Sequence, residues 1–310
     1  MGIPLTISFP GQALLNAVEA QGALPDGVTA IRWSLEEPAP LPHIDIVVPP
    51  YMGSVAVLAA LDSVSCQLVQ SQSIGFDGVA DALPAGHVFA NAAGVHETST
   101  AELALGLIIA AQRGLPDFVR AAERGEWAPE RHASLADRRV LLIGHGGVGR
   151  AIAARLAPFE VDLTIVARTA RETPNGPVHG LGDLPRLLTT AEIVIVAVPL
   201  EADTTHLIDD AFLSAAPEGA LIVNVSRGKV ADTAAVLDHA RRGRLRFALD
   251  VVDPEPLPTG HPLFAQPNVL ISPHVGGATS AMLPRMARLL REQIERMLRG
   301  EPPLNVVLRT

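Results

Sequence analysis

A glycine cluster near the middle of the chain constrains the fold more than any other feature. An apolar run from Val140 leads into Gly144-x-Gly146-x-x-Gly149, and small and apolar residues at helical spacing follow as far as Leu156. This order corresponds to a buried strand, a glycine turn and a helix. In such a unit the first amides of the helix and the positive end of its dipole point toward a phosphate. The arrangement predicts a dinucleotide-binding fold.

Each glycine of the cluster has its own physical reason. Gly144 allows the tight turn, Gly146 lets a pyrophosphate approach the backbone, and Gly149 lets the helix pack closely on the strand. Gly147 and Val148 open the helix and are further candidate contacts. We therefore expect the chain to bind NAD(H) or NADP(H).

The composition limits the class of protein and its partners. At 310 residues the chain suits two domains. The net charge of -9, with dispersed basic residues, argues against nucleic acid as a partner. No uninterrupted apolar stretch reaches the roughly 18 to 20 residues of a membrane span, so we expect no membrane partner.

The number of cysteines and the first residues of the chain indicate the cellular compartment of the protein. Cys66 is the single cysteine, which excludes an internal disulfide and a cysteine-based metal centre, and we expect no metal site. The first residues lack a basic start and a long apolar stretch, so we expect no signal peptide. Together these features favour the cytoplasm.

Short apolar runs alternate with helical patterns over the whole chain, which predicts α/β domains with parallel sheets. In the first hundred residues we expect strands at 5–9, 29–34, 44–48, 67–71 and 87–90, and helices at 13–20 and 55–61. A long helix over 98–113 and a polar loop over 124–139 follow.

The second half predicts a doubly wound dinucleotide domain of six strands. The strands are expected at 140–144, 163–167, 193–198, 220–225, 246–251 and 269–271, and helices begin near Val148, Asp209, Thr233 and Ser280. The last of these helices has one apolar face, which we expect to pack back on the first domain.

Three segments of the second half each follow a predicted strand and therefore lie at the carboxyl edge of its sheet, where open α/β proteins bind ligands. These segments are 224–228, 248–257 and 271–277, and they contain Arg227, Glu255 and His274. A guanidinium can hold and polarise a 2-oxo acid, and an imidazole can donate a proton near neutrality. A carboxylate beside the histidine favours its protonated form. Each residue alone has a structural explanation, but the three together predict reduction of a 2-oxo acid.

From about Gly75 onward the chain resembles the D-isomer-specific 2-hydroxyacid dehydrogenases, the family of glycerate, phosphoglycerate and glyoxylate/hydroxypyruvate reductases. The matching stretches are 100–106, 125–127, the glycine turn, 198–200, 224–228, 250–256 and 272–277. The resemblance implies a dinucleotide-binding domain over 100–278 inserted into a substrate domain made of 1–99 and 279–310. It also implies a homodimer held through the dinucleotide-binding domain.

The resemblance also assigns roles to residues of this sequence. It implies Arg227 as the substrate clamp, His274 as the acid/base and Glu255 as its partner, with the substrate carboxylate on backbone amides near Ile74 and Gly75. Tyr51 is either a hydrogen-bond donor to the substrate or an interdomain packing residue. Further cofactor contacts are implied at Thr100, Val198, Pro199, Thr204, Val225, Ser226, Asp250 and Gly276.

The end of the second predicted strand departs from the commonest NAD pattern. An acid that accepts both ribose hydroxyls is expected there in NAD-binding folds, but this chain has Ala167, Arg168, Thr169 and then Arg171. We expect no carboxylate at this place, so that guanidinium and hydroxyl groups are available to a 2′-phosphate. The pattern favours NADP(H) as the cofactor, with NAD(H) possible. The alternative explanation of the arginines is that they are ordinary solvated charges of a loop.

The sequence thus predicts an NADP(H)-preferring reductase of small 2-oxo acids to D-2-hydroxy acids, with glyoxylate and hydroxypyruvate as the first candidates. One alternative is a dinucleotide-sensing, corepressor-like binding protein of the same fold. Another is a related NAD enzyme such as a phosphite oxidase. That subgroup has a lysine before the glycine that corresponds to Gly75, where this chain has Ser73 and Ile74.

Overall fold

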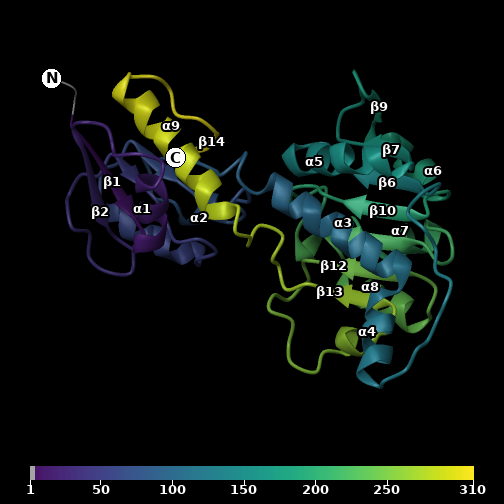
Figure 1. Cartoon of the computed structure of the whole chain (residues 1–310). Helices are drawn as coiled ribbons and strands as arrows, with labels where there is room; N and C mark the ends of the chain where they lie inside the picture. Colours follow the sequence, from purple (N-terminus) through teal and green to yellow (C-terminus); the bar gives the residue numbers. More distant parts are fainter. Residues whose placement is uncertain (1–3) are drawn as a thin grey trace. The chain divides into compact units, whose positions relative to one another are not determined.

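The computed structural model describes residues 4–310, which form two compact units (Figure 1). The first unit contains the chain up to His96 together with Thr279–Thr310, and the second contains Glu97–Ala278. Each unit is an α/β structure with one sheet. Within residues 4–310, every helix is too short or too polar to cross a bilayer.

The sheet of the first unit has the strand order β14-β5-β4-β3-β1-β2. The strands β1 to β5 are all parallel. Their order in the sheet, β2-β1-β3-β4-β5, is that of the flavodoxin-like doubly wound fold. The strands are β1 (Leu5–Phe9), β2 (Val28–Arg32), β3 (Ile46–Val47), β4 (Leu68–Gln70), β5 (Val88–Ala90) and β14 (Val306–Arg309).

Helices cover both faces of this sheet and close two apolar cores. On one face α1 packs against α9, which buries the apolar stripe of the C-terminal helix as predicted. The other face is covered by η1 and α2. The helices are α1 (Gln12–Glu19), the 3₁₀-helix η1 (Val55–Ser63), α2 (Val79–Ala82) and α9 (Met282–Leu298).

The sheet of the second unit has the order β13-β12-β11-β10-β6-β7-β9-β8. The chain therefore crosses from one side of β6 to the other, which makes the β6–β10 boundary the topological switch point of a Rossmann-type sheet. The strands are β6 (Arg139–Ile143), β7 (Asp162–Val166), β8 (Arg171–Thr173), β9 (Gly176–His179), β10 (Ile193–Val196), β11 (Leu221–Asn224), β12 (Arg246–Leu249) and β13 (Val269–Ile271).

Two cores also lie on this second sheet, one under α3 and α5 and the other under α6, α7 and α8. The central strands β10 and β11 are buried on both faces, as expected for parallel strands between helical layers. The helices are α3 (Glu97–Arg113), α4 (Leu115–Glu123), α5 (Gly147–Leu156), η2 (Ala157–Phe159), η3 (Leu181–Asp183), α6 (Leu184–Leu188), α7 (Asp210–Ala215), η4 (Gly228–Val230), α8 (Thr233–Arg241) and η5 (Pro262–Ala265).

The predicted α/β class and the doubly wound sheets are confirmed, with differences at the sheet edges. Both sheets are mixed, because β14 runs antiparallel to β5 and β8 runs antiparallel to β9. The helix expected at 55–61 is a 3₁₀-helix, capped by the Ser54 hydroxyl, which accepts from the Ala56 amide. The helix α4 and the strands β8, β9 and β14 were not predicted.

Candidate active site

The glycine turn connects β6 to α5 at the switch point of the second sheet. A Cβ on Gly144 would stand 2.2 Å from the Ala197 carbonyl oxygen, and one on Gly149 would stand 2.0 Å from the Gly144 carbonyl oxygen. A side chain at either position would collide with the backbone. These two glycines therefore set the close packing of strand, turn and helix.

Gly146 differs from these two, since no described atom lies within 4 Å of the place where its Cβ would stand. The turn is therefore open at Gly146, directly before the helix that starts at Gly147. An open glycine backbone at a helix N-terminus fits the pyrophosphate of a dinucleotide. A Cβ on Gly147 would stand 2.8 Å from Glu97 Oε1, so Gly147 is packed rather than open.

Three further loops lie side by side at the carboxyl edge of the same sheet, after the neighbouring strands β11, β12 and β13. The loop after β11 is shaped by Asn224, whose side-chain oxygen accepts from the amide and hydroxyl of Ser226 and whose amide donates to the Arg227 carbonyl. Val225 and Ser226 are buried in this loop, and Arg227 is half-buried.

Gly228 brings the loop of Arg227 against the loop after β12. A Cβ on Gly228 would stand 1.8 Å from the Val252 carbonyl oxygen, so the two backbones touch. The Thr233 hydroxyl adds a second link by donating to the Asp253 carbonyl at 2.6 Å. The segment that carries Glu255 is thereby fixed beside the segment that carries Arg227.

Asp250 connects the loop after β12 to the loop after β13. Its carboxylate is 3% exposed and accepts from the Ser272 hydroxyl (2.7 Å) and from the amides of Val275 and Gly276 (both 2.9 Å). Gly276 is also required at its position, because a Cβ there would stand 2.9 Å from Asp250 Oδ2 and 3.3 Å from Thr100. The carboxylate of Asp250 therefore organises the loop that holds His274.

His274 lies in the middle of this loop with φ 51°, a left-handed conformation that is uncommon outside glycine. Its amide donates to the Asp250 carbonyl at 2.7 Å, which holds the strained backbone in place. Its Nδ1 is hydrogen-bonded to Glu255 Oε1, and both side chains are about one-third exposed. The structure thus joins the predicted histidine and carboxylate into one hydrogen-bonded pair that reaches the surface.

The loop after β10 carries the predicted contacts Val198, Pro199 and Thr204. The buried hydroxyl of Thr204 donates to the Pro199 carbonyl (2.7 Å) and accepts from the Glu201 amide (2.8 Å). The loop is therefore closed on itself and presents Glu201 at its tip.

The end of β7 contradicts one expectation from the sequence. Arg168 is paired with Glu201, and Asp203 Oδ1 lies 3.6 Å from its Nη2. The expectation that no carboxylate lies at this place was wrong, because both acids come from a loop more than thirty residues further along the chain. Arg171 begins β8, and its guanidinium lies on the glycine turn, where it donates to His145 Nδ1 at 2.9 Å.

The residues predicted to hold the substrate carboxylate belong to the first unit. Ile74 and Gly75 follow β4, and the Ile74 carbonyl accepts from Asn91 Nδ2 at 2.8 Å. The ring of Tyr51 stacks on the ring of His96 with centroids 5.5 Å apart. His96 in turn is hydrogen-bonded to the Gln72 carbonyl at 2.6 Å. Substrate binding by Ile74, Gly75 and Tyr51 stays a prediction.

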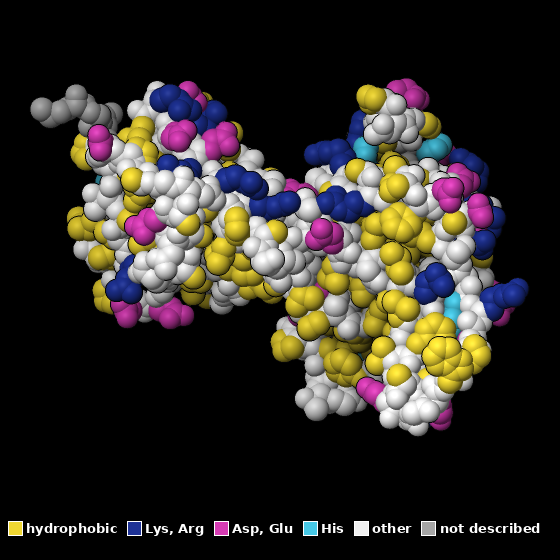
Figure 2. Space-filling model, in the orientation of Figure 1, with side chains coloured by type: hydrophobic (Ala, Val, Ile, Leu, Met, Phe, Trp, Pro, Cys, Tyr) yellow, Lys and Arg dark blue, Asp and Glu magenta, His cyan; other side chains and the backbone are white. Residues whose placement is uncertain are grey.

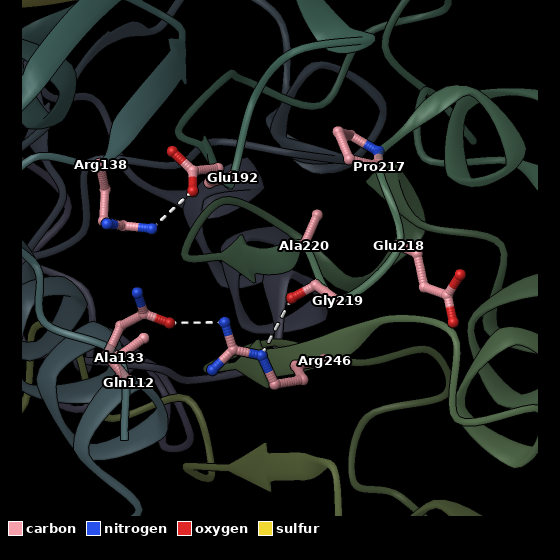
Figure 3. Close-up of a pocket in the computed structure, with 9 residues that line it drawn as sticks. All are labelled: Gln112, Ala133, Arg138, Glu192, Pro217, Glu218, Gly219, Ala220 and Arg246. Atoms are coloured by element: carbon pink, nitrogen blue, oxygen red, sulfur yellow. Dashed lines mark hydrogen bonds and ion pairs between the residues drawn. The ribbon is translucent and has the colours of Figure 1, made fainter. Parts of the chain in front are cut away.

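A separate pocket lies at the opposite, amino-terminal edge of the second sheet (Figure 3). Its volume of about 210 Å³ is below the roughly 300–1,000 Å³ of typical ligand pockets. Arg246 on its wall donates to the Ala111 carbonyl and to Gln112 Oε1 in the last turn of α3, and to the Gly219 carbonyl. A cation at a helix C-terminus is stabilised by the helix dipole. Arg246 therefore has a structural role as a cap of α3.

Comparisons with known proteins agree with this geometry. Residues 105–276 match the family described as D-isomer specific 2-hydroxyacid dehydrogenase, NAD binding domain. The human glyoxylate reductase/hydroxypyruvate reductase is 30% identical over 289 residues, which cover 87% of this chain and 88% of that protein.

Two solved structures match nearly the whole chain. The D-isomer specific 2-hydroxyacid dehydrogenase of Xanthobacter autotrophicus Py2, in complex with NADPH and MES, has a TM-score of 0.82 at 29% identity and covers 99% of this chain and 98% of its own. The NADPH-dependent glyoxylate/hydroxypyruvate reductase of Sinorhizobium meliloti, in complex with NADP and malonate, has a TM-score of 0.80 at 26% identity, with coverages of 98% and 97%.

The glycine turn provides a matched pair of substitutions. We expect Gly149→Ala to destabilise the fold, because its Cβ overlaps the Gly144 carbonyl. Gly146→Ala has room for its Cβ and should keep the melting temperature of the wild type. It should nevertheless weaken NADPH binding at least tenfold, because the methyl group occupies the approach of the pyrophosphate. Thermal melts and NADPH fluorescence titrations check both statements, and tight NADPH binding by Gly146→Ala would contradict this description of the turn.

Proposed function

This chain belongs to the D-isomer specific 2-hydroxyacid dehydrogenase family and is an NAD(P)-dependent oxidoreductase, and we propose that it reduces small 2-oxo acids to D-2-hydroxy acids with NADPH. The observation that carries the proposal is the pairing of His274 with Glu255, on loops that adjoin the loop of Arg227 at the edge of a dinucleotide-binding sheet. Glyoxylate and hydroxypyruvate are the first candidate substrates, since the human relative is named for both.

NADPH held at the glycine turn would supply a hydride for the carbonyl carbon of the substrate. His274 donates a proton to the carbonyl oxygen as negative charge develops there. Glu255 orients the imidazole through its hydrogen bond with Nδ1, which leaves Nε2 to act on the substrate. Arg227 binds the carboxylate and the carbonyl oxygen through its planar guanidinium and stabilises the charge on oxygen in the transition state.

NADPH is the proposed cofactor because basic and hydroxyl groups follow β7 where NAD-specific folds place an acid. These groups are Arg168, Thr169 and Arg171. Two structures of similar proteins contain NADPH or NADP. NAD(H) is a weaker alternative in the same site, since the glycine turn contacts the part that both cofactors share.

Initial rates with a substrate panel test this function. We expect the wild type to oxidise NADPH with glyoxylate or hydroxypyruvate and to prefer NADPH over NADH in kcat/KM. A neutral aldehyde of similar size should be a poor substrate, because it offers no carboxylate to Arg227. Arg227→Lys should raise KM and lower kcat, since lysine keeps the charge but loses the planar fork.

Two results would contradict the assignment. Comparable kcat/KM values for glyoxylate and the neutral aldehyde would remove the carboxylate clamp from the mechanism. Tight binding of NADPH without turnover of any 2-oxo acid would instead favour a dinucleotide sensor of the same fold.

The acid/base pair gives a second prediction. His274→Ala should lower kcat by about 10² to 10⁴ while NADPH binding stays at the wild-type level, because a general acid contributes to the chemical step alone. Glu255→Gln keeps a hydrogen-bonding group but removes the charge, so a smaller loss of kcat is expected. Single-turnover rates and NADPH titrations separate the two effects, and normal turnover by His274→Ala would require another proton donor.

We also propose that the chain forms a homodimer through its second unit. On α4 Leu115 is 45% and Val119 is 59% exposed, and Trp127 after it is 95% exposed. Figure 2 shows hydrophobic side chains over the region of this unit where α3 and α4 lie. Large apolar side chains of this kind favour a protein contact. A second copy is the proposed occupant because the family resemblance implies a dimer on the same domain.

Light scattering after size exclusion tests the dimer. The wild type should have twice the mass of one chain, and the double substitution Val119→Asp, Trp127→Glu should have the mass of one chain. Phe264→Asp is the control, because Phe264 is similarly exposed at 57% but lies on η5. A monomeric wild type, or a double variant that stays dimeric, would contradict this interface.

A further inference from the structure

The two arginines that follow β7 have different electrostatic surroundings. Arg168 is held by the carboxylates of Glu201 and Asp203. Arg171 has no ion pair with any carboxylate in residues 4–310, and its described hydrogen bonds go to the Thr169 carbonyl and to His145. A phosphate that approaches Arg168 meets two negative charges, whereas one that approaches Arg171 meets an uncompensated cation.

His145 lies inside the glycine turn, between Gly144 and Gly146. Its Nδ1 accepts a hydrogen bond from Arg171 Nη2 (2.9 Å), and its carbonyl oxygen lies 3.4 Å from Nη2 of Arg171 and Nη1 of Arg150, which both donate to it. Burial, and then the charges of Arg171 and Arg150, lower the pKa of the His145 imidazole. The lowered pKa favours the neutral ring, whose Nδ1 is the acceptor that orients Arg171.

Arg171 lies between the glycine turn and the end of the second strand, the two places that determine the choice of cofactor. In Rossmann-type folds the ribose of the adenosine lies between the first glycine turn and the end of the second strand. Arg171 begins β8, shortly after the second strand β7, and its guanidinium rests on the glycine turn through His145. Its remaining N–H groups are thus placed where a 2′-phosphate would lie.

We propose that Arg171, positioned by His145, binds the 2′-phosphate of NADPH, and that Glu201 and Asp203 hold Arg168 away from this task. The proposal rests on the proposed preference for NADPH and deepens it by naming the residue responsible. His145 is a positioning residue in this scheme, and Glu201 weakens phosphate binding by compensating the neighbouring charge.

The test is calorimetric titration of the full-length protein with 2′,5′-ADP and with 5′-AMP, which differ by the 2′-phosphate and need no turnover. The wild type should bind 2′,5′-ADP more tightly than 5′-AMP. Arg171→Ala should weaken 2′,5′-ADP binding about 10- to 100-fold, as the loss of charge-assisted hydrogen bonds predicts, and leave 5′-AMP binding unchanged. Arg186→Ala is the matched control, because Arg186 is an exposed arginine on α6 of the same unit and should change neither affinity.

Substitutions of His145 distinguish positioning from a general structural role. His145→Ala should weaken 2′,5′-ADP binding about 3- to 10-fold, which corresponds to one hydrogen bond. His145→Asn should restore most of this loss, since its amide oxygen can accept from Arg171. Loss of 5′-AMP binding by His145→Ala, or absence of rescue by His145→Asn, would contradict the positioning role.

Glu201→Gln should strengthen 2′,5′-ADP binding about two- to fivefold, because it removes an exposed counter-charge. Glu218→Gln makes the same change of charge at the other edge of the sheet and should have no effect. Unchanged binding by Glu201→Gln would overturn the compensating role of Glu201.

The outcomes separate this proposal from the proposed function. If Arg168→Ala loses 2′,5′-ADP binding and Arg171→Ala does not, the phosphate site is Arg168 and the preference for NADPH stands. If the wild type does not distinguish 2′,5′-ADP from 5′-AMP, the preference for NADPH fails and this inference fails with it. Melting temperatures of all variants show whether a loss of binding reflects unfolding.

Discussion

The carboxylate of Asp250 is the interaction on which the arrangement of the site depends. It is buried and accepts three hydrogen bonds, all from the loop after β13. A buried carboxylate is stable only when such donors replace its water shell. The same donors fix the loop in which His274 adopts a left-handed backbone. The strain at His274 is thus maintained by a network whose loss would leave a buried charge unpaired.

Close backbone contacts fix the other loops of the site in the same way that Asp250 fixes the loop of His274. Gly228 allows the loop of Arg227 to touch the loop of Glu255, and Gly149 allows α5 to touch the turn that precedes it. In both cases a methyl group would stand at 2.0 Å or less from a carbonyl oxygen. The charged side chains of the site are therefore carried by backbone segments that have little freedom to separate, which is the preorganisation that transition-state stabilisation requires.

The sequence predicted the features that local geometry determines and missed those that depend on distant neighbours. Apolar runs located β6, β10 and β11, because parallel strands covered on both faces need apolar residues at consecutive positions. The hairpin of β8 and β9 was missed although its two-residue loop, Pro174-Asn175, consists of residues that are common in turns and is followed by Gly176 with φ 107°. The antiparallel edge strand β14 carries no turn signal of that kind, because it pairs with β5 from the far end of the chain.

The charges around the two arginines after β7 also depend on residues that are distant in the sequence and could not be predicted from it. Arg168 and Arg171 are equivalent in the sequence, since both are basic residues just after the second strand of the fold. The fold separates them, because the loop after β10 brings two carboxylates to Arg168 while the glycine turn brings the imidazole of His145 to Arg171. Discrimination between cofactors is a difference of two binding free energies, so it depends on the compensating charges as much as on the cation itself. A basic residue at this position therefore favours a 2′-phosphate only when the surrounding loops leave its charge uncompensated.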